Sequence, residues 1–244
     1  MKKELVKKYL EKVRKDYDFG SEAFSKRSKL WPDTIFLIKE NVEDGDRVLD
    51  IGCGDGRWLE ALAGQDINYV GIDNSRELIK IAKQKHKLLN VKFLDGDVLD
   101  LPFEDGGFSA KGGPASGWDK VLGIAVLHHI PSKELQLKAL MEMHRVLRPG
   151  GKLIMTNWNL ACETWSLKNI FSKKEKGMGL KDLLVPWGIV DNKIKRYYYA
   201  FSLSELTGLV KRAGFKVNQK YYTFKGKKSS FWKRGNMVVV AEKK

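Results

Sequence analysis

The sequence predicts an α/β fold in which helices cover both faces of a mostly parallel β-sheet. Between residues 47 and 157, short apolar runs alternate with stretches of helical periodicity, and this alternation is typical of parallel sheets. A glycine-rich turn follows the first apolar run, so backbone can approach a ligand closely there. Two more apolar runs, 215–224 and 237–241, predict an antiparallel carboxyl-terminal hairpin that completes a seven-stranded sheet.

The individual elements follow from the pattern in chain order. Apolar residues at helical spacing predict an amphipathic helix over residues 1–15. Pro32 suits the first turn of a second helix, which runs to about Asn41. The sequence Arg148-Pro149-Gly150-Gly151 is a strong helix stop. The other predicted elements are strands 47–51, 68–72, 91–95, 119–125 and 152–157, and helices 56–64, 75–87, 132–147 and 202–213.

We expect residues 1–244 to form a single domain with four parts. An amino-terminal helical lid (1–46) precedes a ligand-binding core (47–157), a substrate-side insert (158–200) and a final helix with the hairpin (201–244). The insert interrupts the alternation, so we expect it to overhang a ligand at the carboxyl ends of the strands. Residues 105–118 are rich in glycine and are expected to form a flexible loop.

The net charge of +15 is concentrated in the last third of the chain. Residues 158–244 hold 19 Lys and Arg against 6 Asp and Glu, whereas residues 1–157 hold 26 against 24. This asymmetry favours a large polyanionic partner, with solvated surface charge as the alternative. Two cysteines make no disulfide framework, and no apolar stretch approaches the roughly 20 residues of a membrane span. We therefore expect a soluble, cytoplasmic protein.

The glycine-rich turn carries the clearest functional signal. Asp73 ends the second strand 23 residues after Asp50, the spacing at which an acidic side chain binds ribose hydroxyls. Arg57 stands where a dinucleotide fingerprint has its third glycine, so a nucleoside fits better than NAD or FAD. A capped turn without a ligand is the alternative. The predicted cofactor-binding residues are Asp50, Gly52, Cys53, Gly54, Gly56, Arg57, Asp73, Asn74, Asp97, Val98 and Ala125.

Residues that follow other strands are expected at the same carboxyl-terminal edge of the sheet. Asp97, after the third strand, is expected to accept a hydrogen bond from an adenine amino group while Val98 packs on the ring. After the fourth strand come His128 and His129. No Cys, His or carboxylate at ligand spacing supports a zinc site there, so we expect no metal. We expect one imidazole to face the pocket and the other to pack.

Aromatic and basic residues are interleaved before the first strand, in the insert and in the hairpin connection 225–234. Lys and Arg neutralise phosphates, and an aromatic ring such as that of Trp232 stacks on a base. A lid that only packs and a solvated hairpin tip are the alternatives. The predicted substrate-binding residues are Tyr17, Trp31, Trp158, Trp187, Tyr198, Lys227, Lys228, Trp232 and Arg234.

These motifs resemble the class I methyltransferases that use S-adenosyl-L-methionine (AdoMet), and among them the tRNA wobble-uridine enzymes that esterify 5-carboxymethyluridine. The resemblance covers roughly residues 14–215 and implies a Rossmann-like class I methyltransferase fold. The family's His after Arg-Tyr-Tyr is Tyr199 here, and residues 105–118 do not match. Besides the glycine turn, the matching segments are Tyr17-Asp18, Phe24-Ser25, Arg27, Trp31-Pro32, Ala125–His129, Leu147–Gly151, Leu184–Trp187 and Arg196–Tyr198.

The implied chemistry fits the residues. A carboxylate acceptor has a pKa of about 4, is ionised at neutral pH and needs no general base. It needs a cation that orients it, and arginine is planar and always charged. Arg27 and Arg196 are the candidates, with a structural ion pair as the alternative for each. His128 and Tyr197 complete the predicted catalytic set.

The resemblance also implies partners. It implies tRNA, with no DNA and no membrane, and in eukaryotic members a small zinc-binding activator subunit. Two other classes stay open: a methyltransferase of a small molecule, such as a quinone precursor or carboxylic acid, and a non-catalytic module that binds AdoMet or RNA. A tRNA enzyme predicts RNA affinity that falls steeply as salt rises, whereas a small-molecule enzyme predicts none.

Overall fold

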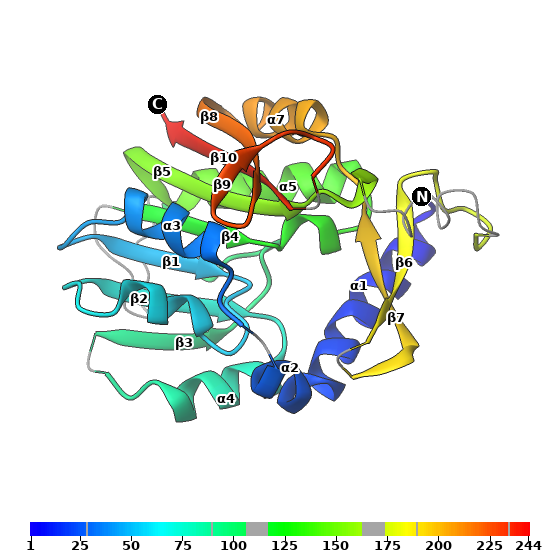
Figure 1. Cartoon of the computed structure of the whole chain (residues 1–244), viewed down its shortest axis with the longest axis horizontal. Helices are drawn as coiled ribbons and strands as arrows, with labels where there is room; N and C mark the ends of the chain where they lie inside the picture. Colours follow the sequence, from blue (N-terminus) through cyan, green and yellow to red (C-terminus); the bar gives the residue numbers. More distant parts are fainter. Residues whose placement is uncertain (28, 89, 106–116, 163–173, 189, 234) are drawn as a thin grey trace.

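The structure is a computed structural model, and it describes every residue except 28, 89, 106–116, 163–173, 189 and 234. Most of the predicted loop 105–118 therefore lies outside the described residues. Within the described residues, eight strands form one sheet in the order β3-β2-β1-β4-β5-β10-β8-β9 (Figure 1). The strands are β1 (Arg47–Ile51), β2 (Asn68–Asp73), β3 (Val91–Asp95), β4 (Trp118–Ile124), β5 (Leu147–Trp158), β8 (Phe215–Phe224), β9 (Lys227–Ser229) and β10 (Asn236–Lys243).

The pairing confirms a mostly parallel sheet with an antiparallel carboxyl-terminal hairpin. Strands β3, β2, β1, β4 and β5 run parallel to one another, and β10 lies antiparallel between β5 and β8. Strand β9, at the edge of this sheet, was not predicted because its three residues are polar and carry no apolar pattern. A turn at Lys225-Gly226, where both residues have positive φ, folds it back onto β8.

The core lies on both faces of the sheet. Successive strand residues alternate between two buried clusters, as the two-residue period of a strand requires. Val48 packs with Leu37 and Ile38 of one cluster, whereas Leu49 belongs to the other, with Leu140. Helices α3 (Pro32–Asn41) and α4 (Arg76–Lys85) supply the first cluster, and α5 (Lys133–Val146) and α7 (Leu203–Arg212) supply the second.

Two of the differences from the predicted elements concern the helix after the glycine-rich turn and the start of the fifth strand. The helix predicted over 56–64 is a short 3₁₀ helix, η1 (Arg57–Leu62). Glycines with positive φ at 56 and 64 interrupt helical backbone at both ends of this segment, and short segments of this kind are often 3₁₀. The stop signal at 148–151 is part of β5, which begins at Leu147 rather than at residue 152. There the register against β4 shifts between Trp118 and Lys120, so these residues form an irregularity within the strand.

A second layer stands beyond the carboxyl ends of the parallel strands. Helix α1 (Lys3–Phe19) lies beside a two-stranded antiparallel sheet of β6 (Asp182–Trp187) and β7 (Asp191–Tyr199), and α2 (Ser21–Arg27) leads back to the main sheet (Figure 1). Two short helices, η3 (Leu127–His129) and η4 (Leu160–Cys162), follow β4 and β5. Among the described helices, none combines the length and apolar character needed to cross a membrane.

Candidate active site

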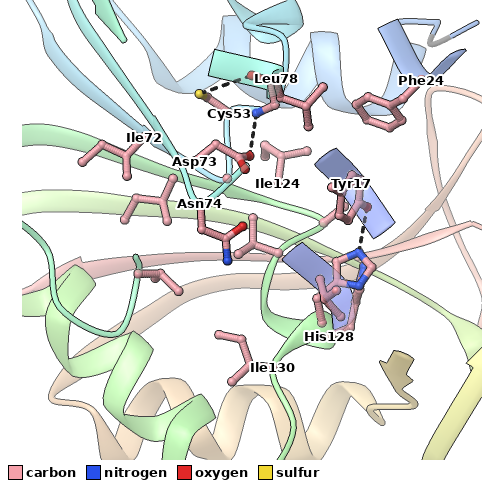
Figure 2. A pocket seen from close by; sticks show the side chains of 18 of the residues that line it. Tyr17, Phe24, Cys53, Ile72, Asp73, Asn74, Leu78, Ile124, His128 and Ile130 are labelled. Carbon is pink, nitrogen blue, oxygen red and sulfur yellow. Dashed lines mark hydrogen bonds between the residues drawn. The ribbon is translucent and has the colours of Figure 1, made fainter. Parts of the chain in front are cut away.

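A cavity of about 360 Å³ lies beyond the carboxyl ends of β1, β2 and β4, a size typical of small-molecule sites. Figure 2 shows Asp73 and Asn74 on one side of it and Tyr17 and His128 on another. The lining residues are Leu10, Val13, Tyr17, Phe24, Lys29, Trp31, Ile51, Gly52, Cys53, Gly54, Arg57, Trp58, Ile72, Asp73, Asn74, Leu78, Gly96, Asp97, Val98, Leu99, Ile124, Ala125, Val126, His128, His129, Ile130, Trp158, Trp187 and Arg196.

The glycine-rich turn forms the floor of this cavity. Gly52 and Gly54 have φ of +68° and +57°, a region that favours glycine. A Cβ on Gly52 would lie 2.5 Å from the side chain of Val126, so a larger residue does not fit. The turn therefore lines the cavity with bare backbone.

Asp73 is held by the backbone of the same turn. Its carboxylate accepts hydrogen bonds from the N–H groups of Gly54 at 2.9 Å and Ser75 at 2.8 Å, and Figure 2 draws the first of these. Burial raises the pKa of Asp73 to about 6, although the backbone donors act in the opposite direction. A carboxylate has about four acceptor sites, so acceptor capacity remains beyond the backbone donors.

Two of the predicted cofactor-binding residues do not line the cavity. Asp50 is fully buried below the turn, where it accepts a 2.5 Å hydrogen bond from the Tyr69 hydroxyl. Burial raises the pKa of Asp50 to about 7, and its other carboxylate oxygen has no partner among the described residues. A Cβ on Gly56 would meet Phe93 and His86 at under 3 Å. Both residues therefore support the turn from behind.

The other predicted cofactor-binding residues line the cavity. Asp97 accepts a hydrogen bond from the Leu99 N–H at 2.9 Å through one carboxylate oxygen, and Val98 lies beside it. Ala125 has a φ of +60°, a strained conformation for a residue with a Cβ. It brings the chain sharply past the end of β4. Asn74 projects into the same space in Figure 2.

Arg57 and Cys53 line the cavity together with the glycine-rich turn. The Arg57 guanidinium lies 4.0 Å from the centroid of the Phe24 ring, and its Nε is 3.2 Å from a carboxylate oxygen of Asp55. This arginine is thus already paired. Burial raises the pKa of the Cys53 thiol well above its usual range, so the sulfur stays protonated and is no nucleophile at neutral pH.

The amino-terminal helices are fastened to the core around the cavity. The Ser75 hydroxyl donates to Asp18 of α1 at 2.8 Å, next to Asp73. From α2, the Ser25 hydroxyl donates to Asp55 at 3.0 Å. These bonds join the helical segment 1–46 to the two loops that carry the glycine turn and Asp73. The segment is therefore joined to the core at the edge of the cavity.

Arg196, on β7, places a buried positive charge in the cavity wall. It is 5% exposed, and its guanidinium carbon lies 4.2 Å from the Trp187 ring centroid and 5.3 Å from that of Tyr198. Its Nη1 donates to the Tyr17 hydroxyl at 2.7 Å. Among the described residues no carboxylate lies at ion-pair distance, and its Nε is buried without a hydrogen-bond partner. The cation is therefore held by rings rather than by an anion.

Both histidines of the pair line the cavity, which corrects the expectation that one would pack away. His129 Nε2 lies 3.1 Å from the Tyr17 hydroxyl, and Figure 2 draws this bond as the dashed line below Tyr17. Burial, and then the charge of Arg196, lower the pKa of His129 to about 3. Burial lowers the pKa of His128 as well, and its Nδ1 accepts from the Trp158 N–H at 3.3 Å. Both rings are neutral at physiological pH.

Three of the predicted substrate aromatics form a wall. The Trp31 and Trp158 ring centroids lie 6.1 Å apart, and both rings line the cavity with Trp187. Tyr198 stacks on Trp158 at 5.2 Å and an interplanar angle of 19°. It does not line the cavity, and it supports Trp158 from behind.

Tyr197, predicted to be catalytic, points away from the cavity. Successive residues of a strand face opposite sides, so Arg196 and Tyr198 share the cavity side of β7 while Tyr197 faces α1. Its hydroxyl donates to Asp182 at 2.6 Å, and its ring lies 5.1 Å from that of Tyr9. The side chain therefore fastens the insert to the helix.

The basic hairpin residues lie outside the cavity. Lys227, Lys228 and Trp232 are exposed on β9 and the connection after it, with Trp232 80% exposed. The Gly226 N–H donates to Asp33 at the start of α3, one residue beyond Pro32 and close in the chain to Trp31. The hairpin thus borders the Trp31 side of the site. Arg234 and the side chain of Arg27 lie outside the described residues.

Several lining residues were missed by sequence reasoning. Leu10 and Val13 were assigned to the apolar face of a packing helix, and Lys29 carried no signal beyond its place near Arg27. His129 was not separated from His128, because adjacent histidines give no indication of which ring meets a partner. That partner, Tyr17, lies 112 residues away.

The donor set of the cavity fits a nucleoside cofactor. It offers a carboxylate with free acceptor capacity at Asp73, a second at Asp97, and bare backbone at the glycine turn. Apolar side chains, including Val98, Leu99 and Ile130, also line the cavity. Within the described part of the chain, no group of three or more His, Cys, Asp or Glu is placed to hold a metal ion.

Comparison with known proteins gives consistent results. A family model described as a methyltransferase domain matches residues 42–214. The tRNA (carboxymethyluridine(34)-5-O)-methyltransferase of Arabidopsis thaliana is 33% identical over 165 residues, covering 67% of this chain and 36% of that protein. The chain spans about a third of the length of the curated tRNA methyltransferases that it matches.

Solved structures share the fold. A SAM-dependent methyltransferase of Methanosarcina mazei superposes with a TM-score of 0.68 at 21% identity, covering 88% of this chain and 99% of that chain. A chain from the complex of the Haloferax volcanii Trm112 methyltransferase activator superposes with a TM-score of 0.66 at 19% identity, covering 94% of this chain and 96% of that chain. The expected Rossmann-like class I architecture is confirmed.

Proposed function

The chain belongs to the methyltransferase-domain family, whose cofactor is AdoMet, and we propose that it methylates the carboxylate of a 5-carboxymethyluridine-type wobble nucleoside in tRNA. The observation that carries this proposal is Arg196, a buried cation in the cavity wall without an anionic partner among the described residues. A buried charge is costly unless it is paired. An anionic group on the substrate would supply the partner that this cation lacks.

On the cofactor side of the cavity, different residues would bind different parts of AdoMet. Asp73 would accept hydrogen bonds from the ribose hydroxyls, Asp97 would accept from the adenine amino group, and Val98 would pack on the ring. Gly52 and Gly54 would admit the chain of the cofactor along bare backbone. When bound, AdoMet supplies an electrophilic methyl group on a sulfonium. The residues of α1 and α2 that line the cavity would exclude water from it.

The residues on the substrate side suit an acceptor that is already ionised. Both histidines are neutral and hydrogen-bonded or buried, and the Cys53 thiol is protonated. None of these is poised to remove a proton at neutral pH. A carboxylate has a pKa of about 4 and needs no base. The task left to the protein is orientation, which contributes much of the rate in reactions between bound groups.

The cation and the aromatic wall together suit a nucleoside acid. Arg196 would bind the carboxylate while Trp31 or Trp158 offers a face on which a base stacks. Tyr198 stiffens this face from behind. The exposed residues Lys227 and Lys228 would contact the RNA backbone beside the Trp31 side of the site. The relatives named as carboxymethyluridine methyltransferases support the same acceptor.

Tyr199, where the resembling family has His, lies off the reaction path. Its hydroxyl donates to Glu205 at 2.7 Å, on the face of β7 away from Arg196. The replacement therefore leaves the proposed carboxylate site unchanged. Arg27 stays a proposed second cation.

We also propose a small activator subunit as a partner. The support is the fold shared with a chain of the Trm112 activator complex. We place the activity in the cytoplasm, because Cys53 and Cys162 are both free and reduced thiols are usual there.

The test is methyl transfer from labelled AdoMet to tRNA from cells that accumulate 5-carboxymethyluridine, followed by nucleoside mass spectrometry, with and without a candidate activator subunit. The proposal predicts a methyl ester at the wobble uridine. Label on a different nucleoside would retain an RNA enzyme and reject the carboxylate. Binding of AdoMet without labelled RNA in either condition would favour the small-molecule alternative.

A further inference from the structure

Resting on the proposed function, we propose that Tyr17 and His129 are positioning residues that aim Arg196 and make the site select a carboxylate over an amide. The three side chains come from three separate elements. Tyr17 lies on α1, His129 on η3 and Arg196 on β7. They meet in one chain of hydrogen bonds at the cavity wall, with the distances 2.7 Å and 3.1 Å.

The direction of each bond in this chain is fixed by chemistry. A guanidinium has donors and no acceptor, so Arg196 Nη1 donates to the Tyr17 oxygen. His129 Nδ1 lies 3.1 Å from the Tyr197 carbonyl oxygen, which only accepts. The ring proton must therefore sit on Nδ1. The Nε2 atom is then an acceptor, and it takes the proton of the Tyr17 hydroxyl.

The opposite arrangement leaves two lone pairs facing each other. If Nε2 carried the proton, the unprotonated Nδ1 would face the Tyr197 carbonyl without a hydrogen. A protonated ring would satisfy both contacts, but burial and the neighbouring Arg196 charge oppose it and place the pKa of His129 at about 3. One neutral tautomer therefore orders the whole chain of bonds.

This order determines which edge of Arg196 meets the substrate. Tyr17 occupies Nη1, on the end of the guanidinium. The Nε–H is buried and has no hydrogen-bond partner among the described residues, so a carboxylate that reached the side edge formed by Nε and Nη2 would satisfy it. Two parallel N–H groups on that edge match the two oxygens of a carboxylate.

An amide cannot complete the same pair. It offers one oxygen acceptor, and its NH₂ group would face a guanidinium donor. A buried donor that faces another donor is left without a hydrogen bond, and this cost strongly disfavours binding of the amide. A free guanidinium could rotate to present another edge, and the hydrogen bond that Arg196 donates to Tyr17 prevents this. Discrimination between the two groups therefore depends on Tyr17 as well as on Arg196.

The test compares Tyr17→Phe with Tyr199→Phe, a matched control whose hydroxyl bonds Glu205 outside the cavity. The substrate is tRNA that carries 5-carboxymethyluridine, and tRNA with the corresponding carbamoylmethyl amide is the competing ligand. Its inhibition constant should lie well above the KM of the carboxylate tRNA in wild type and should fall toward that KM in Tyr17→Phe. We expect Tyr17→Phe to lower kcat on the carboxylate by about 10- to 100-fold, the equivalent of a charge-assisted hydrogen bond. The KM for tRNA and the Kd for AdoMet should stay within about threefold.

A second readout does not depend on turnover. In nitrogen-15 NMR of histidine-labelled protein, His129 should show a proton on Nδ1 and a hydrogen-bonded Nε2. In Tyr17→Phe the Nε2 resonance should move to that of a nitrogen without a donor, and in Tyr199→Phe it should not move. His129→Phe, a second variant, should lower kcat in the same direction by a smaller factor.

The outcomes separate the two proposals. Wild-type protein that forms no ester on the carboxylate tRNA would contradict the proposed function. Wild-type ester formation with equal kcat in Tyr17→Phe and Tyr199→Phe would overturn the positioning role alone. A proton on Nε2 of His129 would also overturn it, whatever the turnover.

Discussion

Arg196 donates a 2.7 Å hydrogen bond to the hydroxyl of Tyr17, although 179 residues separate them in the chain. The bond joins β7 of the insert to α1 of the amino-terminal segment. Tyr197 fastens the opposite face of β7 to the same helix through ring contact with Tyr9. The helix and the insert thus form one wall, and that wall holds a cation over the cavity.

Asp73→Asn should weaken AdoMet binding by about 10- to 100-fold, the range for hydrogen bonds to a charged group. An amide NH₂ would also face one of the two backbone donors, from Gly54 and Ser75, that now point at the carboxylate. Isothermal titration calorimetry measures the effect. Asp95→Asn is the control, since Asp95 is exposed and pairs with Arg76. Equal affinity in both variants would remove Asp73 from the cofactor site.

AdoMet affinity should fall in acid. The pKa of Asp73 is raised by burial to about 6, so the carboxylate is ionised at about pH 8 and mostly protonated at about pH 5. Only the ionised form keeps all its acceptor sites, and one pH unit below the pKa lowers its population about tenfold. Titrations at both values should differ by about this factor. Asp73→Asn should remove the pH dependence.

The turnover rate at saturating AdoMet and tRNA should be flat between about pH 5.5 and 8. The acceptor is ionised throughout this range, and the pKa of His129 is lowered to about 3, so its ring stays neutral. A pH profile of kcat measures this. A rise through about pH 6.5, the usual pKa of histidine, would instead indicate a histidine general base.

Lys227→Ala should weaken tRNA binding and reduce the slope of log affinity against log salt by about 1, as expected for one lost phosphate contact. Lys227 is exposed on β9 beside the start of α3. Lys138→Ala, on the exposed side of α5, is the matched control and should change neither. A shared loss in both variants would point to net charge rather than to a surface at the hairpin.

Much of the fold could be predicted because its signals are local. The apolar run at 47–51 and the Gly52–Gly54 turn identify a strand and a ligand-binding bend within a few residues of each other. The predicted bounds of β1 and β3 agree with the structure. The polar strand β9 has no such pattern, and the stop signal at 148–151 shifts a strand register instead of ending the helix before a loop.

The lining residues on the proposed cofactor side of the cavity were predictable for the same reason, whereas those on the proposed substrate side were not. Asp73 and Asp97 follow strands of a parallel sheet, so their meeting follows from the topology. In the insert, Arg196, Tyr197 and Tyr198 are consecutive, and only the register of β7 determines which of them face the cavity. The contact of Tyr17 with His129 joins elements 112 residues apart, and no local pattern indicates it.

The central claim is that Arg196 binds the acceptor carboxylate, and Arg196→Ala tests it most directly. The measurement is ester formation on 5-carboxymethyluridine tRNA by nucleoside mass spectrometry, together with the Kd of AdoMet on the same preparation. We predict loss of the ester with AdoMet affinity within about threefold of wild type, because Asp73 and the glycine turn are untouched. Wild-type ester formation by this variant would contradict the account.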